Sequence, residues 1–209
     1  MVVGLLSIEL YIPHAQSLKD KRMVLRSIKD RLKKGSEYRF GATFIEWLAA
    51  KGSGPEWGAK LHVSPRPQDL LKSVDLLLPY LRKRGVKHKV ATALAEAELV
   101  TGEHGESQKG KFITIYPATP EQAAQLAFEL DELLQKSGIG AGKRPPYDRP
   151  IGTSGAISYR YGKFRSSKKP IVLPDGREVA DDREAVDQHK AWGLPGLEEL
   201  GPFSRRGKP

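Results

Sequence analysis

The sequence predicts an α+β fold in which helices pack on a central antiparallel or mixed sheet. The first observation is a set of short segments that suit strands, of which KFITIY at residues 111–116 is the richest in β-branched and aromatic residues. The second is a pair of longer segments with leucines at helical spacing, one after Pro67 and one after Thr119. Gly- and Pro-rich stretches separate these segments and mark the turns between them.

The first 36 residues predict a strand and a helix. Residues 2–12 are largely apolar, and Pro13 ends the strand. Ser17 then caps a helix with one apolar face, formed by Val24, Leu25, Ile28 and Leu32. Through IPHAQSLKDKRMVL, about the first 34 residues resemble the start of small uncharacterised bacterial proteins of the YlxP type. We therefore expect a separate appendage at 1–36, and Gly35-Ser36 fits either an engineered junction or a natural fusion.

Residues 37–64 predict a short helix, a turn and a strand. The helix is expected from Thr43 to Ala50, and the turn at residues 52–55. In the strand at 57–64, apolar residues alternate with Lys60, His62 and Ser64, which places these three side chains on one face. A cation beside an imidazole suits anion binding and proton transfer. The alternative is an edge strand with a solvated polar face.

A long helix and several shorter elements follow. The helix ends at Gly85, Pro79 is expected to kink it or to start a second turn, and its apolar face consists of Leu70, Leu71, Val74, Leu77, Leu78 and Leu81. VKHKV at 86–90 and KFITIY at 111–116 predict strands. Between them we expect a short helix at 92–100 and a polar loop at 101–110.

The second long helix has a marked start. Thr119, Pro120 and Gln122 form a capping box, and the helix should run to about Ser137. Residues 137–155 are rich in Gly and Pro, AISYRY at 156–161 predicts a strand, and LPDGR at 173–177 predicts a turn between two short strands. The charged C-terminal residues resemble a linker. We expect the main domain at 37–165 and a hairpin with a charged tail at 166–209.

The composition favours an anionic partner. Of the 209 residues, 35 are Lys or Arg and 25 are Asp or Glu, a formal net charge of +10. That charge fits nucleic acid, a phosphorylated peptide or an acidic surface. Aromatic residues make up only 8% and are not interleaved with basic runs, so a stacking platform for single strands is not expected, and nucleic acid is not the expected partner among the three. The absence of cysteine excludes thiolate zinc sites and a cysteine nucleophile. No apolar run suits a membrane span or a signal peptide, and we expect a cytoplasmic protein.

Basic residues recur at or near several predicted strands: Lys60 and His62, Lys87 and Lys89, Lys111, and Arg160. If the strands bring them to one cleft, they form a cationic site that suits a phosphate. Like charges lower the pKa of a lysine, which then can serve as a general base near neutral pH. The alternative to a phosphate site is that each of these basic residues, taken singly, lies on the surface in contact with solvent.

Four motifs carry a resemblance to a known family. KLHVS (60–64), HKV (88–90), GKFITIYP (110–117) and YRYGKF (159–164) resemble, in this order and spacing, the lyase domain of class III and class IV lanthipeptide synthetases. LPDGREVADDR (173–183) resembles the segment that follows that domain in class III enzymes. The lyase domain is itself similar to phosphothreonine lyase effectors of pathogenic bacteria. The resemblance covers roughly residues 55–183.

The resemblance implies a phosphothreonine-lyase-like fold and a β-elimination that uses neither a metal nor a cofactor. The substrate would be phosphoserine or phosphothreonine in a precursor peptide, and the product dehydroalanine or dehydrobutyrine. Lys89 would be the base that takes the Cα proton, and His62 the acid that protonates the departing phosphate oxygen. Phosphate would be bound by Lys60, Arg160 and Lys111. A separate kinase and a cyclase would be the partners, since the chain has no kinase signature.

The chain departs from the family pattern at three points. An arginine expected between the KLHVS strand and Lys89 is not assigned, since Arg66 also suits a surface role. Residue 88, before the presumed base, is a histidine where an aromatic or apolar residue is expected, so His88 either titrates in the site or points away from Lys89. A supporting tyrosine is not assigned among Tyr116, Tyr159 and Tyr161, each of which suits the core equally. The rival function is a phosphopeptide- or RNA-binding module with a basic cleft and no catalysis.

Overall fold

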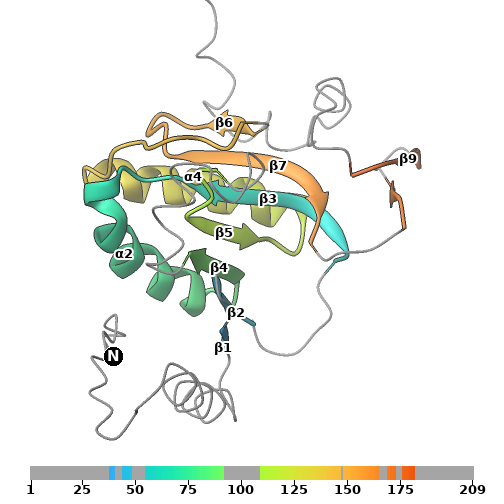
Figure 1. The fold of residues 1–209 in the computed structure, drawn as a ribbon, viewed down its shortest axis with the longest axis horizontal. Helices are drawn as coiled ribbons and strands as arrows, with labels where there is room; N and C mark the ends of the chain where they lie inside the picture. Colours follow the sequence, from blue (N-terminus) through green and yellow to red (C-terminus); the bar gives the residue numbers. More distant parts are fainter. Residues whose placement is uncertain are drawn as a thin grey trace, which may run out of the picture.

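The computed structural model describes residues 38–40, 44–48, 55–91, 109–146, 148–164, 169–172 and 176–181. Its main feature is a seven-stranded sheet in which each neighbouring pair of strands is antiparallel (Figure 1). In spatial order the strands are β1 (Tyr38–Phe40), β2 (Phe44–Trp47), β4 (Lys87–Ala91), β5 (Ile113–Tyr116), β3 (Trp57–Val63), β7 (Ile157–Lys163) and β6 (Arg149–Ile151). A separate two-stranded sheet pairs β8 (Ile171–Val172) with β9 (Glu178–Val179).

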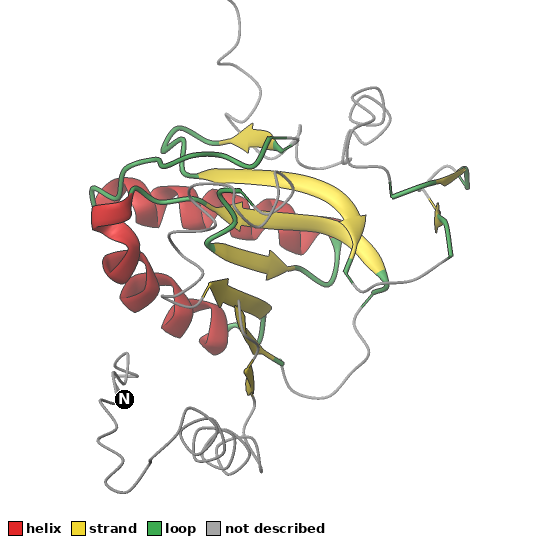
Figure 2. Ribbon diagram, viewed as in Figure 1, coloured by secondary structure: helices red, strands yellow, loops and turns green. Residues whose placement is uncertain are grey.

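The long helices pack against this sheet and form a single hydrophobic core with it (Figure 2). The 3₁₀-helix η1 (Pro67–Asp69) leads into α2 (Leu70–Lys83), which continues past Pro79 as one element. Helix α4 (Pro120–Lys136) begins at the predicted cap, because Thr119 Oγ1 accepts a hydrogen bond from Gln122 N at 3.1 Å. The predicted α+β fold with an antiparallel sheet is therefore confirmed.

The apolar residues of the predicted central strands supply the sheet's half of this core. Leu61, Val63, Ile113, Ile115 and Ile157 are fully buried beside leucines of α2 and α4. Because successive strand residues point to opposite faces, the residues that alternate with them lie on the other face of the sheet. That other face carries Lys60, His62, Lys89 and Arg160.

One predicted element was wrong, and strand β6 was not predicted. Residues 44–47 are strand β2 and not part of a helix, because their backbone pairs with β4 from Phe44 opposite Ala91 to Trp47 opposite His88. Pairing with a neighbouring strand outweighs a weak local helix preference. The Gly- and Pro-rich stretch 137–155 contains β6, a three-residue strand that pairs with β7. Pro150 sits in β6 at the edge of the sheet, where a missing N–H is tolerated.

Several predictions concern residues that the structure does not describe. The appendage at 1–36, the short helix at 92–100, most of the loop at 101–110 and the tail beyond residue 181 lie outside the described residues. Of the predicted turn at 173–177, residues 173–175 also lie outside the described residues, and the two short strands expected beside it are β8 and β9. Neither helix of this part is long and apolar enough to cross a membrane.

Candidate active site

The strand register brings the predicted base and acid to one row across the sheet. Lys89 of β4 lies opposite Thr114 of β5, and Thr114 lies opposite His62 of β3. His62 in turn lies opposite Ser158 of β7. Residues directly opposite each other in antiparallel strands share a face. The four side chains therefore lie on the same face, which is opposite the helix-covered core.

A second pair completes the cationic surface two residues along the strands. Lys60 lies directly opposite Arg160, so both share the face of His62. The charges of Lys60 and Lys111 both reach His62, since each lowers its pKa. The structure thus brings Lys60, Lys111 and Arg160 together around His62, with Lys89 in the same row.

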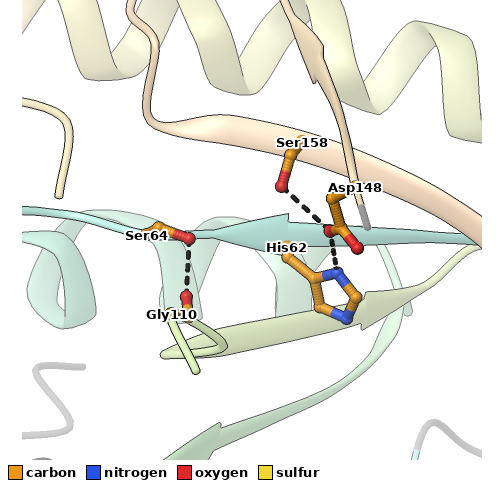
Figure 3. A network of polar contacts seen from close by, with 5 residues as sticks. All are labelled: His62, Ser64, Gly110, Asp148 and Ser158. Atoms are coloured by element: carbon orange, nitrogen blue, oxygen red, sulfur yellow. Dashed lines mark hydrogen bonds and ion pairs between the residues drawn. The ribbon is translucent and has the colours of Figure 1, made fainter. Parts of the chain in front are cut away.

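His62 is held by a buried carboxylate that the sequence reasoning missed. Its Nδ1 lies 2.5 Å from Asp148 Oδ2, and Ser158 Oγ donates to the same oxygen at 3.0 Å (Figure 3). An ionised carboxylate only accepts hydrogen bonds, so Nδ1 carries the proton of this contact. The Nε2 atom is then left to face the site. Asp148 therefore fixes the tautomer and the orientation of the imidazole.

The loop that carries Asp148 is fastened to the end of β3. Gly142 N donates to Ser64 O at 2.7 Å, and Ser64 Oγ donates to Gly110 O at 2.5 Å (Figure 3). Gly110 has a φ of +77°, and a Cβ there would lie 2.0 Å from Lys143 O. Only glycine fits this contact. Residues 60–64 are thus not a solvated edge, because His62 and Ser64 are both buried.

Burial dominates the protonation of this pair. It lowers the pKa of His62 to about 4, although the charge and hydrogen bond of Asp148 act in the opposite direction. Burial also acts against the charged form of Asp148, but His62, Ser158 and Lys111 together hold its pKa below the usual value. Near pH 7 the free protein therefore contains a neutral imidazole bonded to a carboxylate.

Lys89 has an aromatic neighbour that orients it. Its Nζ lies 3.8 Å from the centroid of the Phe44 ring, a cation–π contact. Glu46, which lies opposite Lys89 in the register, directs its carboxylate to Lys87 at 3.0 Å and Arg39 at 3.4 Å. Lys89 thus lies over the ring of Phe44, whereas Lys87 pairs with the carboxylate of Glu46 and lies 5.4 Å from the centroid of the Tyr116 ring.

The floor between Lys89 and His62 is Thr114, a second residue that the sequence reasoning missed. Its side chain is buried, and its Oγ1 has no hydrogen-bond partner within the described part of the chain. The alternation in KFITIY, together with the register, was the signal that could have placed it on this face. For Asp148 the sequence offers only an acidic residue just before a short strand.

The open question about His88 has a structural answer. His88 lies opposite Ile115, so it faces the core and points away from Lys89. Its ring stacks on Trp47 with centroids 5.3 Å apart, and its Nδ1 is 2.8 Å from Val86 O. Burial lowers its pKa to about 4. Trp47 and His88 therefore form a buried pair on the face that does not carry the site.

The three candidate tyrosines separate in the same way. Tyr159 and Tyr161 belong to the hydrophobic core. Tyr116 lies opposite Lys87 on the site face, and the Lys87 Nζ is 5.4 Å from the centroid of its ring. Among the three, only Tyr116 is on the side of the sheet where it can support the site.

Acidification should destabilise the protein before its carboxylates titrate. The folded-state pKa of His88 is about 4 and its ordinary value 6.5, so between these values the unfolded chain binds more protons. The contribution of the buried, neutral histidines to the free energy of unfolding is therefore fully present above about pH 6.5. It is lost as the pH falls toward 4, and the loss for His88 is about 3 kcal/mol. His88→Phe keeps the stacking on Trp47 and should remove the part of the pH dependence that comes from His88. The part that comes from His62 should remain. Urea unfolding at pH 7 and pH 4 measures it, and an unchanged pH dependence in the variant would contradict the prediction.

Comparison with known families gives two matches. The family described as the RamC N-terminal domain matches residues 25–195. A family described as a protein of unknown function, DUF503, matches residues 3–37, the segment in which we expect an appendage. The first match includes every described residue of the candidate site.

Comparison with single proteins agrees with the first match. A protein described as probable SapB synthase, from Streptomyces coelicolor, is 28% identical over 166 aligned residues, in an alignment that covers 72% of this chain and 17% of that protein. The chain thus spans less than a fifth of the length of that relative.

The fold is also found among solved structures. The Chromobacterium violaceum VirA (SpvC) phosphothreonine lyase effector superposes with a TM-score of 0.51 at 14% identity, over 88% of this chain and 98% of that chain. The phosphothreonine lyase SpvC, an effector from Salmonella, gives a TM-score of 0.47 at 21% identity, over 60% of this chain and 69% of that chain. The predicted phosphothreonine-lyase-like fold is confirmed by the first of these.

Proposed function

This chain belongs to the family of RamC N-terminal domains, and we propose that it is a phosphoserine/phosphothreonine lyase of lanthipeptide biosynthesis. It removes phosphate from a phosphorylated precursor peptide by β-elimination. The observation that carries the proposal is the row of Lys89, Thr114 and His62 on one cationic face, with His62 fixed by Asp148. The row places a candidate base and a candidate acid two strands apart.

The proposed reaction is an elimination with two proton transfers. Lys89, as the neutral amine that the neighbouring cations favour, takes the Cα proton of the phosphorylated residue, and the electrons of the C–H bond form the Cα–Cβ double bond. The Cβ–O bond breaks, and the departing phosphate oxygen receives a proton from His62. The products are dehydroalanine or dehydrobutyrine and inorganic phosphate, so no atom is left unassigned.

The acid role requires that His62 is protonated when substrate is bound. In the free protein burial lowers its pKa to about 4, so near pH 7 it must gain a proton on substrate binding. A phosphoryl group carries about −1.5 to −2 charges near pH 7, and a negative charge beside an imidazole raises its pKa. The substrate therefore supplies the field that turns a neutral histidine into an acid.

The cations supply the rest of the transition-state stabilisation. We propose that Lys60, Lys111 and Arg160 bind the phosphate oxygens, on which negative charge grows as the Cβ–O bond breaks. Fixed charges in a partly buried site stabilise such growing charge strongly. Arg160 adds a planar fork of donors that fits two oxygens at once.

A direct assay tests the proposal. The protein is incubated with a synthetic peptide that contains one phosphothreonine, and mass spectrometry follows the loss of phosphoric acid. We expect loss with phosphopeptide and none with the unphosphorylated peptide. Salt-sensitive binding of phosphopeptide or RNA without elimination of any phosphopeptide presented would contradict the proposal and indicate a non-catalytic anion-binding module.

Other proteins or domains would complete the pathway. We propose that a kinase attaches the phosphate and that a cyclase uses the dehydrated residue, because the proposed reaction needs the first and yields a substrate for the second. The length of the SapB synthase relative supports additional domains around such a unit. We also propose that residues 1–36 form a separate appendage, supported by the DUF503 match to residues 3–37.

Arg160→Ala should weaken phosphopeptide binding more than it affects kcat. The loss of charge-assisted hydrogen bonds should raise KM by about 10- to 100-fold. Arg160→Lys keeps the positive charge but lacks the paired donors of the guanidinium. Its KM should lie between those of Arg160→Ala and the wild type. Arg84→Ala is the matched control, since Arg84 pairs with Glu129 at 2.8 Å on the helix surface. Normal phosphopeptide binding by Arg160→Ala would remove it from the phosphate site.

A further inference from the structure

Arg160 faces an acidic residue from beyond the predicted main domain. Asp181, which follows β9, places its Oδ1 3.7 Å from Arg160 Nη2. The side chain of Arg160 is 3% exposed and that of Asp181 is 18% exposed. Asp181 Oδ1 has no hydrogen-bond partner among the described residues. The two charges are thus an ion pair in a mostly buried place, at a distance too long for a direct hydrogen bond.

The backbone of β7 leaves room for this contact. A Cβ at Gly162 would lie 2.9 Å from Asp181 Oδ1 and 3.0 Å from Arg160 Nη2. Any larger residue there would push the carboxylate and the guanidinium from their present positions. Gly162 is opposite Gly58 in β3, and the ring of Phe164 covers Gly58, where a Cβ would lie 2.9 Å from it.

We infer that Asp181 is a resident counter-ion of the phosphate site, which the substrate's phosphate replaces. A buried guanidinium without a counter-charge is unfavourable, so a carboxylate is a suitable partner while the site holds no substrate. The phosphate brings more negative charge than the carboxylate and can also reach Lys60 and Lys111. This inference rests on the proposed phosphate-binding role of Arg160.

The exchange determines which anions can occupy the site. If a glutamate or aspartate side chain of a peptide bound to Arg160, one carboxylate would replace another, that of Asp181. The net gain in binding free energy would therefore be small. A phosphoryl group near pH 7 carries up to two charges and gains the additional lysines. Asp181 therefore keeps acidic peptides out of the site and helps to release inorganic phosphate after the reaction.

The test compares Asp181→Asn with Glu178→Gln, which removes the same charge from an exposed position of β9 on the same segment. Three quantities are measured: the KM of a phosphoserine peptide, inhibition by inorganic phosphate, and inhibition by the same peptide with glutamate at the phosphoserine position. In Asp181→Asn we expect KM and the phosphate inhibition constant to fall about 5-fold or more. The glutamate peptide should become a measurable inhibitor. Glu178→Gln should behave as the wild type does.

Weaker phosphopeptide and phosphate binding by Asp181→Asn would overturn the inference, because Asp181 would then orient Arg160 for the substrate. Unchanged constants would overturn it as well. Binding of inorganic phosphate is also measured by calorimetry, which does not depend on turnover. If the wild type eliminates no phosphate from any peptide but Asp181→Asn still binds phosphate more tightly, the counter-ion stands and the proposed lyase function fails.

Discussion

Lys89→Ala should lower the elimination rate by about 10²–10⁴-fold, the range that a positioned general base contributes. The Cα proton of a peptide is very weakly acidic, so no other step can proceed without a base at that position. Phosphopeptide binding should change little, because Lys60, Lys111 and Arg160 remain. Single-turnover mass spectrometry gives the rate, and a phosphopeptide titration gives the affinity.

Lys87→Ala is the control for this experiment. Lys87 is on the same strand and the same face, two residues away, but its Nζ pairs with Glu46 at 3.0 Å. If Lys89 acted only through its positive charge, the two variants would lose similar activity. We expect a loss of only a few-fold for Lys87→Ala. Substantial turnover by Lys89→Ala, or an equal loss in both variants, would remove Lys89 as the base.

The sequence predicted the site where local patterns sufficed. Alternation predicted that Lys60, His62 and Ser64 share one face, and the resemblance to the lyase domain of lanthipeptide synthetases selected Lys89, Lys111 and Arg160 as their companions. The structure shows these residues gathered as expected, because antiparallel pairing of β4, β5, β3 and β7 brings distant motifs into register. The roles that we assign to them remain proposals.

The partners of these residues could not be predicted in the same way. Asp148 is 86 residues from His62 in the chain, and the two meet because the stretch before Asp148 is hydrogen-bonded to the end of β3 through Gly142 N and Ser64 O. Asp181 reaches Arg160 from a segment that the sequence reading assigned to a hairpin and tail. Such contacts depend on loop paths, which carry no periodic pattern. Strand β2 was missed because its identity comes from pairing with β4.

Asp148→Asn should lower kcat by about 10²-fold while KM changes little. The carboxylate supports the protonated form of His62, since its charge and its hydrogen bond both raise the pKa of the imidazole. An amide removes that charge and can also hold the ring in the wrong tautomer. His62 would then be harder to protonate in the substrate complex. The descending limb of the pH profile of kcat should accordingly move to lower pH.

Ser158→Ala is the control that distinguishes the effect of the Asp148 charge from the effect of a hydrogen bond to it. It removes the 3.0 Å hydrogen bond to Asp148 Oδ2 but leaves the carboxylate and its contact with His62. We expect only a few-fold loss of kcat and a pH profile close to that of the wild type. Melting temperatures of both variants show whether a loss of folding explains the loss of rate. A stable Asp148→Asn protein with an unshifted pH profile would mean that the carboxylate only packs against His62. Some other group would then have to stabilise the protonated form of His62.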